Sequence, residues 1–254
     1  MNPIIVLWCH PRSMSTVIER VMRERGDCTC FHEPFLHHYY IDRAVRDLPH
    51  FDVDPATPTT YAEIRDGLLA AAQQGAVFVK DMSYYVVPTL FDDAEFAARV
   101  THSFLIRDPV ASILSHHKLD PGVTREEIGL EAQWRHVSWL IETTGETPVV
   151  VEAESVQRDA QAIIGAYWRR IGLPLVADAF EWSSDDIPDD WRQVAGWHET
   201  VSTSGAIRDY SADDAAAHRA EFEAAAAAAP QLWDYLAHHQ PFYEKLRALA
   251  LRPD

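Results

Sequence analysis

Four polar side chains follow the first apolar run of the chain. Arg12, Ser13, Ser15 and Thr16 come shortly after the run from Ile4 to Trp8. The run predicts a strand and the spacing after it predicts a helix. The turn between them would gather unpaired N–H groups at the positive end of the helix dipole. A guanidinium and hydroxyls suit the oxygens of phosphate or sulfate, so the stretch predicts an anion-binding loop. A capped helix beside a surface arginine is the alternative.

Two better-known anion loops do not match this stretch. A nucleotide triphosphatase loop requires Gly-x-x-x-x-Gly-Lys followed by Ser or Thr, and the stretch contains neither glycine nor lysine. A cysteine phosphatase places its arginine about six positions after the thiolate, whereas Arg12 follows Cys9 by three positions. We therefore expect Cys9 to pack within the strand.

A second arginine and serine occur further along, in "FLIRDPVASILSHH". Arg107 ends an apolar run, Asp108 and Pro109 predict the start of a helix, and Ser115 falls about two turns into it. The sequence thus contains two strand-ending arginines, each with hydroxyls near it.

Together the two motifs resemble those of sulfotransferases that use 3′-phosphoadenosine 5′-phosphosulfate (PAPS). In that family, a Pro-(Lys/Arg)-Ser/Thr loop holds the 5′-phosphosulfate, and an arginine with a serine eight positions later holds the 3′-phosphate. The resemblance covers residues 3 to 205 and implies PAPS as donor, with Arg107 and Ser115 on its 3′-phosphate. It assigns the 5′-phosphosulfate to Pro11, Arg12, Ser13, Met14, Ser15 and Thr16. "GWHETVSTSG" looks like the loop that closes over the donor, which adds Ser202, Thr203, Ser204 and Gly205.

Two positions depart from the family pattern. Met14 stands where many members have glycine, the residue that lets backbone approach an anion closely, and Arg12 replaces the usual lysine. The guanidinium of Arg12 stays protonated, so its expected role is electrostatic.

Sulfuryl transfer also needs a base for the proton of the acceptor. "FHEPF" is similar to a segment of bacterial and fungal members, and Glu33 within it is our first candidate, with a pKa expected to rise among apolar neighbours. His32 is a second candidate, since imidazole titrates near neutrality, although a structural hydrogen bond is its alternative. Lys80 ends another apolar run and could contact the transferred group; a surface ion pair with Asp81 is the alternative.

Composition limits the partners. The chain of 254 residues has 39 acidic and 22 basic side chains, a net charge of -17, which argues against nucleic acid or acidic polysaccharide as a general partner. Adjacent histidine pairs lack the spacing of a zinc site, so we expect no metal. No window reaches the roughly 18 apolar residues of a membrane span, and three cysteines fit reduced thiols, so we expect a cytoplasmic protein.

The leading hypothesis is a sulfotransferase acting on a hydroxyl or amine of a small-molecule acceptor, with no metal, nucleic-acid or membrane partner. A kinase-like nucleotide phosphotransferase and a non-catalytic nucleotide-binding protein are the alternatives. The sequence leaves homodimer formation open.

Alternating strand-like and helix-like segments predict the elements that position these residues. Apolar runs alternate with helical spacing, which predicts a three-layer α/β fold, with a mostly parallel sheet of about five strands and helices on both faces. We expect a single sulfotransferase-like domain over residues 1–254. Within it we expect a surface excursion at 41–60, a helix from Tyr61 to Gln74 and C-terminal helices at 211–254, with Ser211 and Asp213 as cap candidates and Pro230 as a stop.

Overall fold

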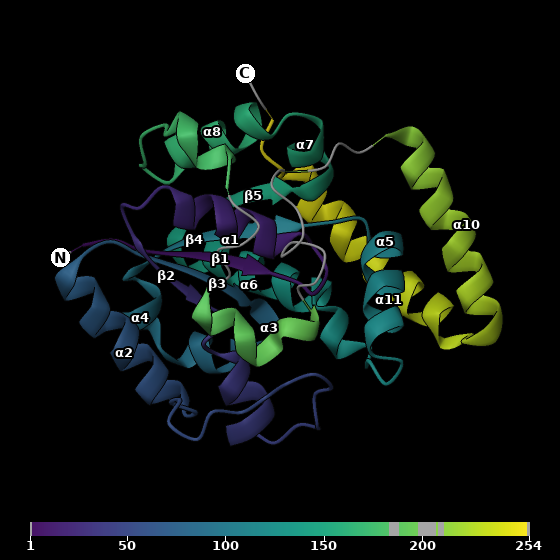
Figure 1. The fold of residues 1–254 in the computed structure, drawn as a ribbon, viewed down its shortest axis with the longest axis horizontal. Coiled ribbons are helices and arrows are strands. Elements are labelled where there is room, and N and C mark those ends of the chain that lie inside the picture. The colour runs from purple at the N-terminus through teal and green to yellow at the C-terminus, as the bar shows by residue number, and fades with distance from the viewer. Residues whose placement is uncertain (1, 183–187, 198–206, 208–210, 253–254) are drawn as a thin grey trace. The chain divides into compact units, whose positions relative to one another are not determined.

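The computed structural model of the chain describes residues 2–182, 188–197, 207 and 211–252. Its centre is a five-stranded parallel sheet in the order β2-β3-β1-β4-β5, with helices around it (Figure 1). This confirms the predicted three-layer α/β fold. The strands are β1 (Ile4–Cys9), β2 (Thr29–His32), β3 (Val77–Met82), β4 (Val100–Ile106) and β5 (Val149–Glu152).

The helices occupy the segments with helical spacing. The longer ones are α1 (Ser15–Glu24), α2 (Tyr61–Gln74), α5 (Pro109–Leu119), α6 (Leu130–Thr144), α8 (Ala160–Arg170), α10 (Ala212–Ala228) and α11 (Gln231–Ala248). The shorter ones are η1 (His38–Asp42), α3 (Ser83–Val86), η2 (Thr89–Asp92), α4 (Ala94–Ala97), η3 (Glu126–Ile128), α7 (Ala153–Arg158), η4 (Ala177–Phe180) and η5 (Asp189–Trp197).

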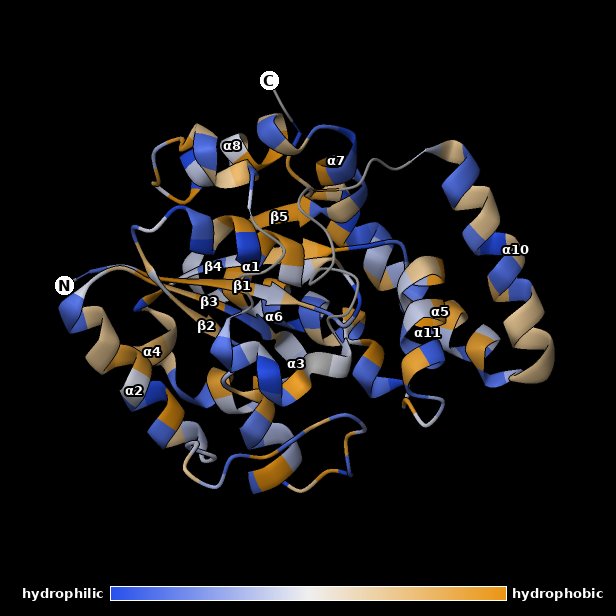
Figure 2. Cartoon of the chain, in the orientation of Figure 1, coloured by the Kyte–Doolittle hydropathy of each residue, from blue (hydrophilic) through white to orange (hydrophobic). Residues whose placement is uncertain are grey.

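The strands are apolar because a parallel sheet is covered on both faces. Every residue of β1 and of β3 is buried, and Figure 2 shows the strands mainly in the hydrophobic colour. In the register, Thr29 of β2 lies opposite Val77 of β3, and Ser103 of β4 lies opposite Val149 of β5. The sequence runs that predicted the strands are therefore the core of the sheet.

The described chain divides into two compact units. The first comprises Met1–Trp8, Thr16–His102 and Val176–Ile207, and the second comprises Cys9–Ser15, Ser103–Leu175 and Arg208–Asp254. In the first unit, α2 begins at a capping box in which Thr60 and Glu63 exchange side-chain and backbone hydrogen bonds. Residues 43–59, within the predicted excursion, form no regular element.

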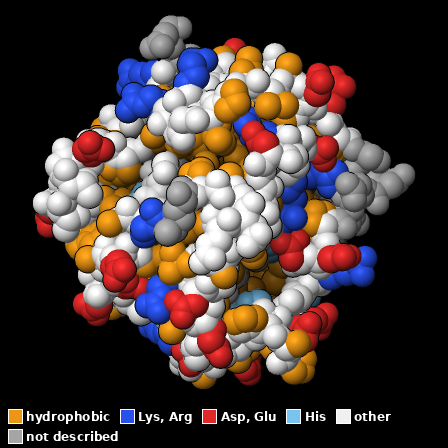
Figure 3. Space-filling view, turned by 90° about the vertical axis from the view of Figure 1, so that its left-hand side faces the viewer, with side chains coloured by type: hydrophobic (Ala, Val, Ile, Leu, Met, Phe, Trp, Pro, Cys, Tyr) orange, Lys and Arg blue, Asp and Glu red, His pale blue; other side chains and the backbone are white. Residues whose placement is uncertain are grey.

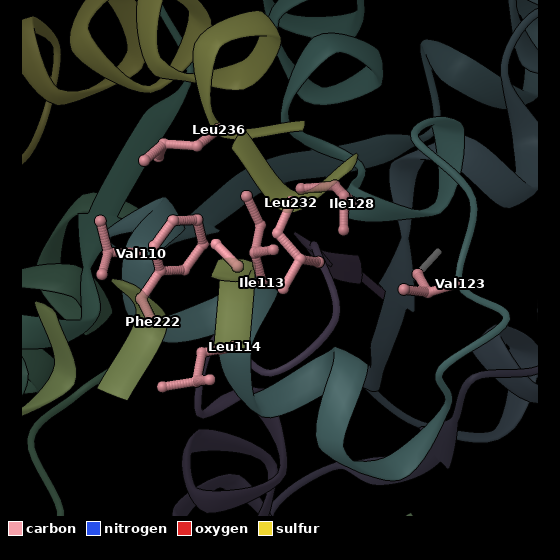
Figure 4. Packing of buried hydrophobic residues seen from close by; sticks show 9 residues of the cluster. Val110, Ile113, Leu114, Val123, Ile128, Phe222, Leu232 and Leu236 are labelled. Atoms are coloured by element: carbon pink, nitrogen blue, oxygen red, sulfur yellow. The ribbon is translucent and has the colours of Figure 1, made fainter. Parts of the chain in front are cut away.

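A separate apolar core holds the C-terminal helices in the second unit. Ile113 and Leu114 of α5 pack with Phe222 of α10 and with Leu232 and Leu236 of α11 (Figure 4). The prediction of helices at the C-terminus is thus confirmed. They cover α5, the helix that carries Ser115.

Local signals set the ends of these helices. Ser211 caps α10, as predicted, and its partner in the capping box is Asp214, while Asp213, the other cap candidate, lies in the first turn of the helix. Pro230 precedes the first residue of α11 and separates the two helices. Beyond α11, the backbone N–H of Leu251 donates to the carbonyl of Val150 at 2.7 Å, which occupies part of the outer edge of β5.

The surface is mixed in charge. On the face in Figure 3, acidic and basic side chains are interspersed with hydrophobic ones. Among the helices that the structure describes, none combines the length and apolar character that a membrane crossing requires.

Candidate functional site

The loop after β1 has an unusual backbone. Arg12 has φ of 62° and Met14 has φ of 69°, in the left-handed region that favours glycine. A non-glycine residue there costs roughly 1–2 kcal/mol. Among the described residues, five non-glycine positions have positive φ, and Glu33 (φ 44°) is another of them. Such strain persists where the surroundings enforce it, often at functional sites, and three of the five positions are candidate site residues.

Met14 therefore adopts the conformation that glycine would supply. Having methionine in place of glycine at position 14 adds a side chain and backbone strain, but the left-handed turn is kept.

The two anion motifs meet within the second unit. The guanidinium Nε of Arg12 donates to the hydroxyl of Ser115 at 2.9 Å, and Nη1 of Arg107 donates to the carbonyl oxygen of Arg12 at 2.9 Å. The side chain of Arg107 is therefore bonded to the backbone of the first loop. Two arginines 95 positions apart in the chain thus belong to one cationic group.

Further polar atoms in this group fit an oxyanion. The hydroxyl of Ser13 and Nε of Arg107 are buried and have no hydrogen-bond partner within the described chain. Buried donors in native proteins are normally paired, so the unpaired hydroxyl of Ser13 beside two guanidiniums suits phosphate or sulfate oxygens. Pro11, Ser15 and Thr16 are also buried.

Two residues that the sequence reading missed hold Arg107 in place. The backbone N–H of Arg107 donates to Nε2 of His10 at 3.0 Å, and the N–H of Asp108 donates to Oε1 of Glu154 at 3.0 Å. The same Glu154 oxygen lies 4.0 Å from Nε of Arg107. Burial lowers the pKa of His10 to about 3, so its ring is neutral and accepts this hydrogen bond. Glu154 lies in "VVVEAESV", a segment whose acidic character was the available signal.

The second group of candidate residues lies within the first unit, at the ends of β2 and β3. Lys80, completely buried, donates to Oε1 of Glu33, and the hydroxyl of Tyr85 donates to Oε2 at 3.2 Å. Burial alone would raise the pKa of Glu33, but the ammonium of Lys80, which donates to its carboxylate, lowers it overall. The expectation of a raised pKa was therefore wrong, because the apolar environment contains a buried cation.

Lys80 does not form the surface ion pair with Asp81 that was the alternative prediction, because its side chain is buried. Its partner is Glu33, whereas Asp81 accepts backbone N–H groups of Phe35 and Met82 at 2.9 and 2.8 Å. Burial raises the pKa of Asp81 well above its ordinary range, although both hydrogen bonds oppose the shift.

His32 makes a structural hydrogen bond. Its Nδ1 lies 2.6 Å from Oε2 of Glu19, and burial followed by the charge of Lys80 lowers its pKa well below 6.5. The expectation that His32 titrates near neutrality was thus wrong. With Nδ1 directed at a carboxylate, the neutral ring carries its proton on Nδ1.

Glu19 joins three elements of the first unit. It accepts from the ring of His32 in β2, from Nε1 of Trp191 in η5 at 2.9 Å, and from Nε of Arg23 in α1 at 2.9 Å. Arg23 also bonds Asp190 at 2.6 Å. These contacts fix the residue next to Glu33 and dock the segment that precedes the predicted late loop.

Two further expectations concern the late loop and a metal site. Ser202, Thr203, Ser204 and Gly205 lie outside the described residues. Across 2–182, 188–197, 207 and 211–252, no three His, Cys, Asp or Glu side chains gather in a way that could hold a metal ion.

The fold and the two groups define an α/β protein with a strained, cationic anion loop after its central strand. The family model described as "Sulfotransferase domain" matches residues 3–248, so the chain belongs to the sulfotransferase domain family.

Solved structures share the fold. The chain is similar to the sulfotransferase domain from the Synechococcus PCC 7002 olefin synthase, with a TM-score of 0.51, 18% identity and coverage of 87% of this chain and 94% of the other. It is also similar to the sulfotransferase domain from the curacin biosynthetic pathway, with a TM-score of 0.52, 17% identity and coverage of 82% and 84%.

The curated relatives have names that refer to aminotransferases and not to sulfotransferases. Branched-chain-amino-acid aminotransferase-like protein 2 of Arabidopsis thaliana is 26% identical over 79% of this chain, and protein 1 of the same name is 25% identical. The chain spans about a third (35% and 36%) of the length of these relatives.

Proposed function

We propose that the chain transfers a sulfuryl group from PAPS to a hydroxyl or amine of a small molecule. The observation that carries the proposal is the joining of Arg12, Ser115 and Arg107 by two hydrogen bonds of 2.9 Å. PAPS carries anionic groups at two ends, and two arginines from separate strand ends would give one cation to each. Membership of the sulfotransferase family supports the type of reaction.

The residues that would hold PAPS divide between its two anionic ends. The loop, with Arg12 and the unpaired hydroxyl of Ser13, would hold the 5′-phosphosulfate, and Arg107 with Ser115 would hold the 3′-phosphate. When bound, PAPS supplies an activated sulfuryl group. Arg12 stabilises negative charge and does not donate a proton, because guanidinium stays protonated.

We assign removal of the acceptor proton to Glu33. Its lowered pKa keeps the carboxylate ionised at neutral pH, and Lys80 and Tyr85 orient both of its oxygens. A base must begin the reaction deprotonated, and the Lys80 ammonium ensures this. His32 is neutral and bonded to Glu19, so its role is to fix the strand end beside Glu33.

Glu33 follows the carboxyl end of β2 and the anion loop follows that of β1, and the carboxyl ends of parallel strands are where such folds place ligands. The acidic net charge of -17 favours an acceptor that is not a polyanion. We also propose a cytoplasmic location on the basis of the cysteine content.

Calorimetric binding tests the donor. We expect 3′-phosphoadenosine 5′-phosphate to bind wild type at least tenfold more tightly than adenosine 5′-phosphate, with the difference lost in Arg107→Ala. Arg135→Ala, at an exposed arginine of α6, is the matched control and should behave as wild type.

Each other result has a definite meaning. Preference for ATP with Mg²⁺ would refute the PAPS assignment in favour of phosphotransfer. Tight binding without sulfation of any hydroxyl or amine in an acceptor panel would favour a non-catalytic nucleotide-binding protein. Loss of sulfation in Glu33→Gln with unchanged nucleotide affinity would support its role as base.

A further inference from the structure

A cleft separate from the donor-binding residues lies at the carboxyl end of β5, within the second unit. Its volume is about 690 Å³, and Glu152, Ser155, Arg158, Arg247 and Leu251 are among its lining residues. This volume is in the range of small-molecule pockets, and the carboxyl end of a strand is the usual place for a ligand in an open α/β sheet. No residue assigned above to PAPS lines it.

A buried carboxylate organises the cleft. Oε1 of Glu152 accepts from Nε of Arg247 at 2.7 Å and from the hydroxyl of Tyr243 at 3.2 Å. Oε2 accepts from the hydroxyl of Ser155 at 2.6 Å and from Nη2 of Arg158 at 3.3 Å. Both oxygens of Glu152 are thus engaged, and one carboxylate holds two guanidiniums in place.

The guanidinium N–H groups of Arg158 and Arg247 that do not contact Glu152 are accessible to a ligand. The side chains of Arg158 and Arg247 are 56% and 60% exposed. Nε and Nη1 of Arg158 and both Nη groups of Arg247 have no hydrogen-bond partner within the described chain. Arg252 adds a third guanidinium to the lining. Fixed guanidinium forks lose little entropy when they bind a tetrahedral anion.

The other acidic residues of the lining have partners of their own. Asp159 caps α8 by accepting the N–H of Ala162 at 3.0 Å, and Glu244 accepts from Gln240 at 3.0 Å. Glu152 is neutralised by its two arginines. The open hydrogen-bond donors of the cleft are those of its arginines, and they lie beside the second carboxylate oxygens of Asp159 and Glu244.

We propose that this cleft binds a small molecule that carries a phosphate monoester. At neutral pH such a group carries a charge close to -2 and three acceptor oxygens, which match the open edges of Arg158 and Arg247. Ile163 and Leu251 line the same cleft and provide apolar contact for the organic part of the ligand. The proposal does not depend on the identity of the sulfuryl donor.

Nuclear magnetic resonance of the arginine Nε–Hε groups tests the proposal on the full chain. Phenyl phosphate is the probe, and Arg158→Lys and Arg247→Lys assign the two signals. We expect both signals to shift to saturation with one dissociation constant, and Arg158→Gln to weaken binding about tenfold. The signal of exposed Arg135 should not saturate, and Arg135→Gln should leave the affinity unchanged.

Three results would overturn the proposal. Shifts of Arg158 and Arg247 that increase linearly, or equally with those of Arg135, would show only general ionic attraction. Saturable binding that Arg158→Gln does not weaken would place the phosphate elsewhere. Inorganic phosphate binding as tightly as phenyl phosphate would contradict the apolar contribution. Signals of Arg12 and Arg107 report separately on the donor loop, so binding there is not mistaken for binding in the cleft.

Discussion

Replacing Lys80 by methionine should leave the carboxylate of Glu33 buried without its cation. Lys80 is completely buried and Glu33 is 7% exposed, so water cannot replace the lost partner. For two unit charges at an ordinary hydrogen-bond distance of about 3 Å and an effective dielectric constant of about 20, the attraction is roughly 5 kcal/mol. Removing one member of a buried pair costs about 3–5 kcal/mol in other proteins. We expect Lys80→Met to lower the free energy of unfolding by about that amount at pH 8.

The loss should depend on pH. In the wild type, the pKa of Glu33 is lowered, so its stabilising contribution is present above the pKa of the unfolded chain and is lost as the pH falls through the folded pKa. In Lys80→Met, burial acts without the opposing ammonium and should raise the pKa of Glu33. Glu33 then takes up a proton in mild acid, and the difference from wild type should become smaller at pH 5 than at pH 8.

Urea unfolding of four proteins at both pH values measures these effects. The proteins are wild type, Lys80→Met, Glu33→Gln and the double variant Lys80→Met/Glu33→Gln. The double variant should be more stable than Lys80→Met at pH 8, because it no longer buries an unpaired charge. A loss below about 1 kcal/mol in Lys80→Met, or a loss equal at pH 5 and pH 8, would refute a strong buried pair.

Three further measurements examine other features. Met14→Gly should raise the free energy of unfolding by about 1 kcal/mol, because Met14 has φ of 69°; a decrease would contradict a strained loop. Trp191→Phe removes the indole N–H that donates to Glu19 and should cost about 1.5–3 kcal/mol in urea unfolding, with unchanged stability as the contrary result. Burial lowers the pKa of His10 to about 3 and that of His239 to about 4. Since the unfolded histidines bind protons below pH 6.5, stability should fall by up to about 1.4 kcal/mol per pH unit for each as the pH decreases from 6.5 toward 4; a flat profile would contradict their burial as neutral rings.

The sequence predicted the sheet well because the strands of a covered parallel sheet are continuous apolar runs. β1 and β3 fall on such runs, and α2 has the predicted bounds Tyr61–Gln74. The loop after β1 was predicted from local chemistry, since a strand, a turn and a helix are neighbours in the chain. Its contact with Ser115 was not predicted, because local spacing contains no information about a partner 103 positions away.

The electrostatic environment could not be predicted in the same way. Glu33 was expected to have a raised pKa from its apolar neighbours, but the deciding residue is Lys80, 47 positions later. Glu19 has the sequence context of an exposed helix residue paired with Arg23, yet it is completely buried by contacts with His32 and Trp191. Buried ionic networks combine residues from distant segments, and their pKa values depend on the whole combination.

The hydrogen bond between Glu19 and Trp191 also constrains the order of folding during synthesis. The two residues are 172 positions apart, and the first unit takes one segment that ends at His102 and another that begins only at Val176. At about 5–20 residues per second, the ribosome needs roughly 5–20 seconds to extend the chain from residue 102 to residue 197. During that interval Glu19, Arg23 and His32 are present without Trp191 and Asp190. The nascent chain therefore completes this buried network only after most of the second unit has been synthesised.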